Sequence, residues 1–242
     1  MTDRVGPETR VWGLWDTIVR SLVSFILSTY VAYVFSQLFM IIATAALVEG
    51  IEITDMVGFD PNTAGGPTYV FFTLVRAAVG IVLLFMMLPW RSTGATEYLG
   101  LGLPELRLTV KYSAVMTVLL GAPRLLGLLR RMPLVPDTAI DAYRGAGSLV
   151  AYWAALVIAA PLYEELLFRG FLFKGIERSR LGGWTALHTQ YRGYQIVPIV
   201  IHGLYYGWAR WKTGSTGLAV LLHAIANAVV VGEAAIASTF LN

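Results

Sequence analysis

The sequence predicts an all-α, polytopic membrane protein of about six transmembrane helices with an interfacial N-terminal helix. Of its 242 residues, 57% are hydrophobic and only 14% are charged, and the mean hydropathy is +0.66. Soluble domains carry about 25% charged residues, so this chain has too few polar side chains to cover a globular surface in water. Six apolar stretches also approach or exceed the roughly 17–25 residues that a helix needs to cross a bilayer.

The N-terminal residues favour the membrane interface. Residues 8–20 mix arginines with acidic residues, and Trp12 and Trp15 precede the first apolar stretch. Tryptophan is enriched at the headgroup level of bilayers. The segment lacks the short apolar core and small-residue cleavage site of a signal peptide. We therefore expect an interfacial helix over residues 8–20, followed by a retained first span.

The predicted spans follow one another along the chain, without a linker that would divide it. They cover residues 21–48, 69–89, 108–129, 147–173, 195–211 and 216–240. We expect a single membrane domain over residues 1–242, located in the cell membrane. The segment 96–112 is amphipathic and is interrupted by Pro104, so we expect it to lie along the membrane surface.

The distribution of charge predicts an orientation. Basic residues gather in the N-terminus and in loops 90–110 and 174–194, whereas loop 49–68 has four acidic residues and no basic one. The positive-inside rule favours placing the basic loops in the cytoplasm, although the arginines around residue 130 do not fit this pattern. The chain has no run of basic residues interleaved with aromatics, so we expect membrane lipid and no nucleic acid as a partner.

The absence of cysteine narrows the possible chemistry. It excludes disulfides, thiolate metal ligands and a cysteine nucleophile. Ionisable side chains inside apolar spans are costly and therefore informative. The fourth span ends with Glu164, Glu165 and Arg169. Arg169 follows Glu165 by four residues and can pair with it, whereas Glu164 lies about 100° away around the helix.

Two adjacent carboxylates in a low dielectric do not both ionise cheaply, and an arginine favours ionisation of its own partner. This pattern makes Glu165 and Arg169 structural partners and Glu164 the candidate general base. The alternative is a helix end that emerges from the membrane, where these charges are ordinary interfacial residues.

The last two predicted spans carry further polar groups. His223 and Asn227 are four residues apart in an apolar run, so both can donate to one oxygen. Taken alone, they are more typical of a pair that packs helices together. His202 lies near the middle of the span 195–211, where a single histidine is also typical of helix packing. The occurrence of these groups and Glu164 on three consecutive spans favours a shared site.

These motifs resemble those of the CAAX-protease and bacteriocin-processing (CPBP) family of intramembrane glutamic endopeptidases. Glu164, Glu165 and Arg169 form E-E-x-x-x-R, and His223 and Asn227 form H-x-x-x-N. The run EELLFRGFLF is similar to the family's first motif, and KTGSTGLAVLLHAIAN to the approach to its last. The resemblance covers about residues 147–230, the expected catalytic core. It implies a hydrolase that needs no metal or cofactor and cuts a membrane-associated or C-terminally modified peptide or protein.

The family's central histidine has two candidates in this chain. The family places an aromatic residue four positions before it, whereas His202 is preceded there by Pro198 and His188 by Trp184. His202 lies within a predicted span and His188 lies among polar residues. We therefore predict His202 as the central histidine, with His188 as the alternative.

The resemblance implies a mechanism. Glu164 activates a water as general base, His202 orients that water, and His223 and Asn227 stabilise the oxyanion. Two alternatives remain open. One is a zinc-dependent membrane protease with Glu164, His202 and His223 as ligands, although the chain has no H-E-x-x-H motif. The other is a non-catalytic bacteriocin-immunity or membrane-binding protein.

Overall fold

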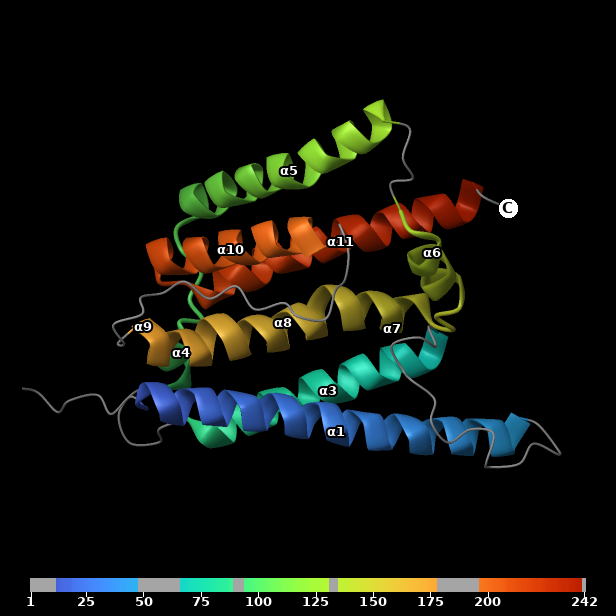
Figure 1. Cartoon of the computed structure of the whole chain (residues 1–242), viewed down its shortest axis with the longest axis horizontal. Coiled ribbons are helices and arrows are strands. Elements are labelled where there is room, and N and C mark those ends of the chain that lie inside the picture. The colour runs from blue at the N-terminus through green and yellow to red at the C-terminus, as the bar shows by residue number, and fades with distance from the viewer. Residues whose placement is uncertain (1–11, 48–65, 89–93, 131–134, 178–195, 241–242) are drawn as a thin grey trace, which may run out of the picture.

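The computed structural model describes residues 12–47, 66–88, 94–130, 135–177 and 196–240, which form helices joined by short connections, with no strand among them (Figure 1). This confirms the predicted all-α class. The helices are α1 (Leu14–Leu47), α3 (Gly66–Met87), α4 (Ala95–Leu99), α5 (Leu106–Leu129), α6 (Asp137–Arg144), α7 (Leu149–Trp153), η2 (Ala154–Ala159), α8 (Ala160–Glu165), η3 (Leu166–Leu172), α9 (Phe173–Glu177), α10 (Ile196–Thr213) and α11 (Thr216–Phe240).

Five helical segments among these residues are long and apolar enough to cross a membrane, which confirms a multi-pass membrane protein. They are Leu14–Ile42, Gly66–Met87, Leu106–Leu129, Leu149–Leu172 and Thr216–Phe240. The sixth predicted span corresponds to α10. It is a helix of 18 residues whose last turn carries Arg210 and Lys212, and it is not one of the five.

The N-terminal helix is not separate from the first span. Leu14 to Arg20 form the first turns of α1, which continues without a break to Leu47, while residues 8–11 lie outside the described part. Trp12 joins this end of α1 to the end of α3, because its indole Nε1 donates to the Met87 carbonyl at 2.9 Å. The guanidinium of Arg20 lies 3.8 Å from the centre of the Trp12 ring, a favourable cation–π contact.

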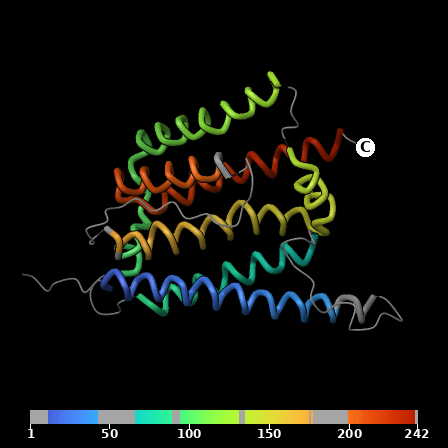
Figure 2. Tube along the Cα trace, in the orientation of Figure 1, coloured from blue at the N-terminus to red at the C-terminus, as the bar shows by residue number. Residues whose placement is uncertain are grey.

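The continuous helical rod from α7 to α9 lies at the centre of the bundle (Figure 2). Helices α3 and α1 lie on one side of this rod, and α11, α10 and α5 lie on the other. The start of α1, α4 and α9 share one end of the bundle, and α6 and the end of α11 lie at the opposite end (Figure 1). The first of these ends is the one that the basic loops were predicted to share; the side of the membrane that it faces stays a prediction.

Small residues allow α1 to pack closely on its neighbours, as is common between membrane helices. The buried face of α1 carries hydroxyl side chains and one alanine: Thr17, Ser21, Ser24, Ser28, Ala32 and Ser36. Ser28 Oγ and the Tyr163 hydroxyl form a hydrogen bond of 2.9 Å. Tyr163 in turn lies against Gly80 of α3, where a Cβ atom would stand only 2.2 Å from its ring. Gly80 therefore makes room for the tyrosine that precedes Glu164.

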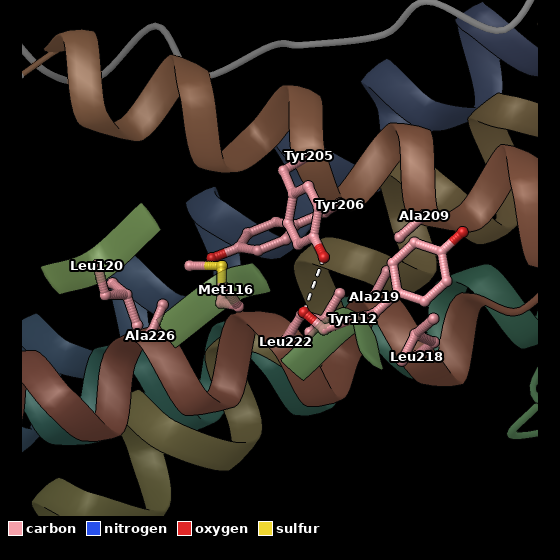
Figure 3. Packing of buried hydrophobic residues seen from close by; sticks show 10 residues of the cluster. All are labelled: Tyr112, Met116, Leu120, Tyr205, Tyr206, Ala209, Leu218, Ala219, Leu222 and Ala226. Atoms are coloured by element: carbon pink, nitrogen blue, oxygen red, sulfur yellow. Dashed lines mark hydrogen bonds between the residues drawn. The ribbon is translucent and has the colours of Figure 1, made fainter. Parts of the chain in front are cut away.

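An apolar cluster joins α5, α10 and α11 on the other side of the central rod (Figure 3). Its members are Tyr112, Met116, Leu120, Tyr205, Tyr206, Ala209, Leu218, Ala219, Leu222 and Ala226. The Tyr205 hydroxyl donates to the backbone carbonyl of Tyr112 at 2.7 Å, which joins α10 to α5. This packing fixes α10 beside α11, although α10 is not one of the five helices that are long and apolar enough to cross a membrane.

Segment 96–112, which the sequence predicts to lie along the membrane surface, begins with α4 packed into one end of the bundle (Figure 1), and its place along the membrane stays a prediction. Tyr98 and Leu99 of α4 are buried, and Leu99 packs on Gly170, where a Cβ atom would meet its Cδ2 at 3.1 Å. The backbone carbonyl of Leu99 accepts from Thr216 Oγ1 at 2.5 Å, and that of Gly100 accepts from Thr216 N at 2.7 Å. These backbone bonds draw α4 into the bundle, since they satisfy polar groups away from water.

We predict that Gly80→Ala lowers the free energy of unfolding by about 1–3 kcal/mol, the usual cost of overpacking a core. The added methyl displaces the Tyr163 ring and its bond to Ser28. Gly121→Ala is the matched control, because Gly121 lies in α5 with no atom within 4 Å of its added Cβ, and alanine is the better helix former by about 1 kcal/mol. Denaturant unfolding in micelles measures both; equal stabilities of the two variants would contradict this packing.

Candidate active site

The two motif glutamates end a short α-helical segment between two π-helical ones. Helix α8 (Ala160–Glu165) follows η2 (Ala154–Ala159) and precedes η3 (Leu166–Leu172). Segments of π-helix are rare and occur frequently at functional sites, since they change the direction of side chains within a helix. Glu164 is half-buried and Glu165 is fully buried. The two carboxylates therefore lie in different surroundings.

Glu165 forms a buried ion pair with Arg169. Arg169 Nη1 donates to Glu165 Oε1 at 3.1 Å, and the side chains are 0% and 1% exposed for Glu165 and Arg169 respectively. The four-residue spacing predicted this pair. A buried charge is tolerated only when it is paired and hydrogen-bonded, so each of these residues requires the other.

The same carboxylate oxygen contacts the last motif. His223 Nδ1 lies 2.9 Å from Glu165 Oε1, and the His223 side chain is 10% exposed. Glu165 Oε2 is buried and has no hydrogen-bond partner among the described residues. One carboxylate oxygen therefore joins η3 and α11 through two positively polarised groups.

Arg169 also connects the remaining helices of the site. Its Nη2 donates to the backbone carbonyl of Gly203 on α10 at 2.7 Å. Its own backbone carbonyl accepts from Arg210 Nε at 3.1 Å and from Thr216 Oγ1 at 3.3 Å. Through these bonds Arg169 fixes α10 and the start of α11 against η3.

Sequence reasoning missed Tyr206, which lies between the two histidines. Its ring centre is 5.2 Å from that of His223, at an interplanar angle of 21°, and 6.5 Å from that of His202. The guanidinium of Arg169 lies 5.8 Å from the same ring. Tyr206 follows His202 by four residues, so a search for aromatic residues on the face of α10 that carries His202 would have found it.

The remaining predicted residues lie around this group. His202 is half-buried, and its ring centre lies 6.5 Å from that of Tyr206. Asn227, one turn beyond His223, is half-buried, and its Nδ2 donates to the Leu156 carbonyl in η2 at 2.8 Å. The structure thus joins Glu165, Arg169 and His223 directly and leaves Glu164, His202 and Asn227 at their edges.

Two predictions remain to be placed: the alternative central histidine and the zinc-dependent alternative. His188 and Trp184 lie outside the described residues, and so does the side chain of Pro198. Within the described part of the chain, no three His, Asp or Glu side chains converge closely enough to hold a metal ion. The described residues therefore offer no ligand set for the zinc-dependent alternative.

Comparison with known proteins connects the site to a family. Residues 146–229 match the family model of "Rce1-like: Type II CAAX prenyl endopeptidase Rce1-like". The matched segment contains both motifs, His202 and Tyr206. No curated protein and no solved structure matches the chain. The match confirms the resemblance to the CAAX-protease and bacteriocin-processing family.

We predict that Arg169→Met lowers the free energy of unfolding by about 3–5 kcal/mol, because breaking a buried pair leaves the other charge uncompensated. Arg124→Met is the matched control. Arg124 pairs with Glu233 through Nε–Oε1 and through Nη2–Oε2 at 2.8 Å, but both side chains are 23% exposed. Because this pair is less buried than the Glu165–Arg169 pair, the control should lose less. Equal losses, measured by unfolding in micelles, would show that the Glu165–Arg169 pair is not the more costly one to break.

Proposed function

We propose that this chain, whose residues 146–229 carry the CAAX-protease family region, hydrolyses peptide bonds in the membrane with a water activated by Glu164. The family match and the five apolar helices support a CAAX-type protease embedded in the membrane. The general base, the other site residues and the substrate are parts of the proposal.

The different surroundings of the two glutamates carry the proposal. Glu165 is fully buried, and its Oε1 is engaged by Arg169 and His223. A carboxylate committed to two partners is poorly placed to take a proton from water. Glu164 is half-buried on the adjacent helical face. It is therefore the better candidate for the general base.

The proposed reaction is a direct attack by water. Glu164 takes a proton from the water, and the hydroxide attacks the carbonyl carbon of the scissile bond. The tetrahedral intermediate then collapses, the C–N bond breaks, and the leaving amine takes the proton from Glu164. His202 orients the attacking water.

Hydrogen bonds to the oxyanion supply the rest of the proposed catalysis. His223 and Asn227 are the candidate donors, each contributing about 3–4 kcal/mol of transition-state stabilisation. An amide carries two N–H groups, so Asn227 keeps one for this purpose while the other bonds to Leu156. The contact of Asn227 with η2 also fixes its position next to the motif helix.

The substrate is proposed to be a membrane-associated or C-terminally modified peptide or protein. Helix α10, which carries His202, exposes Ile201, Leu204 and Trp208 on its outer face. An apolar face of this kind suits contact with lipid or with the apolar part of a membrane-bound substrate.

We predict that Glu164→Gln abolishes cleavage, by at least about 100-fold in kcat, while the protein folds normally. The purified chain is reconstituted in liposomes with a library of membrane peptides that have free or lipid-modified C termini. Products are identified by mass spectrometry. Glu105→Gln is the matched control, since Glu105 is exposed at the start of α5 and its loss should leave turnover unchanged.

Full turnover in Glu164→Gln would show that Glu164 is not the base, and binding without cleavage in the unsubstituted chain would favour the non-catalytic alternative.

The central histidine is tested in the same assay. His202→Ala should abolish cleavage and His188→Ala should have little effect. Loss in His188→Ala alone would transfer the role of orienting the water to His188.

A further inference from the structure

We propose that Glu165 is a positioning residue that holds His223 with a hydrogen on Nδ1 and so sets the tautomer and the orientation of its ring. The sequence assigns Glu165 only to Arg169. The structure adds His223 Nδ1, 2.9 Å from the oxygen that Arg169 Nη1 approaches to 3.1 Å. This inference rests on the proposed function for its catalytic consequence, but the geometry of the contact is independent of it.

The direction of the hydrogen bond follows from its partners. Arg169 is the counter-charge of the Glu165 carboxylate, and an ionised carboxylate only accepts hydrogen bonds. The hydrogen in the 2.9 Å contact therefore belongs to His223 Nδ1. In a neutral histidine, the hydrogen bond that the ring makes decides which of its two nitrogens carries the hydrogen. Glu165 therefore selects the Nδ1–H form.

The surroundings of the ring reinforce this selection. The Tyr206 ring stacks on His223 at 5.2 Å between centres, and Tyr206 is itself packed in the cluster of α5, α10 and α11 (Figure 3). Glu165 fixes the edge of the imidazole and Tyr206 fixes its plane. Together they determine where Nε2 lies.

This arrangement limits what His223 does in the reaction. With Nδ1 as donor, Nε2 has a lone pair in the neutral ring and carries a hydrogen only in the doubly protonated ring. His223 therefore donates to an oxyanion only while its ring is positively charged, and Glu165 then compensates that charge. In the neutral ring, Nε2 accepts a proton instead. Carboxylate–histidine pairs act in this way in other hydrolases, where the carboxylate sets the tautomer.

The test is nuclear magnetic resonance of the full chain in bilayers, with histidine labelled at both ring nitrogens with ¹⁵N. The chain has only three histidines, so His188→Asn and His202→Asn variants assign the His223 signals. At a pH where the ring is neutral, we expect the hydrogen on Nδ1. In the double variant Glu165→Leu/Arg169→Met, we expect it to shift toward Nε2. Replacing both partners leaves no uncompensated buried charge, and such replacements are often neutral for stability.

The matched control is Arg124→Met/Glu233→Leu, which removes the other ion pair of α11 and should leave the His223 signals unchanged. The proposal would be overturned if His223 Nδ1 carried no hydrogen in the unsubstituted chain. It would also be overturned if the hydrogen stayed on Nδ1 in Glu165→Leu/Arg169→Met. If that variant does not fold, the spectrum of the unsubstituted chain still decides.

In the cleavage assay, Glu165→Leu/Arg169→Met should lose at least about tenfold in kcat with little change in KM. Absence of any cleavage by the unsubstituted chain would refute the proposed function and leave the resonance result standing.

Discussion

The site depends on one interaction, the buried carboxylate of Glu165 that Arg169 and His223 share. A charge with no exposure to solvent costs several kcal/mol unless it is paired. Compensating Glu165 therefore requires η3 and α11 to meet in a single register, with Oε1 between the guanidinium and the imidazole. Arg169 extends this requirement to α10 through its bond to the Gly203 carbonyl. The segments η3, α10 and α11 are thus positioned by one ion pair and its hydrogen bonds.

The remaining parts of the bundle support this arrangement from both sides. On one side, Gly80 and Ser28 receive the Tyr163 ring and its hydroxyl, which sets the rotation of α8 just before the two glutamates. On the other, Tyr206 separates His223 from His202 and packs in the cluster of α5, α10 and α11. These contacts are apolar or neutral, as suits a protein whose outer surface meets lipid. They allow the few ionised groups to be concentrated at the site, where membrane proteins place their costly charges.

Much of this arrangement could be predicted from the sequence, because its signals are local. The long apolar runs predicted the membrane helices, and the four-residue spacing predicted that Glu165 and Arg169 share a face. The contact between Glu165 and His223 joins residues 58 apart in sequence, and no local pattern indicates it. The burial of Leu99 has a similar cause, since it depends on backbone bonds to the start of α11 that hydrophobic periodicity does not encode. Tyr206 was overlooked because an aromatic residue in an apolar span is ordinary until its neighbours are known.

The central claim is that Glu164 activates a water and does not itself attack the peptide bond. A single turnover in water enriched in ¹⁸O tests this most directly, with products and the peptide containing Glu164 analysed by mass spectrometry. The account predicts one ¹⁸O atom in the new C-terminal carboxylate and none in Glu164, because the hydroxide adds to the substrate carbonyl. An ¹⁸O atom in the Glu164 carboxylate after the first turnover would contradict it, because that result requires a covalent intermediate at this residue.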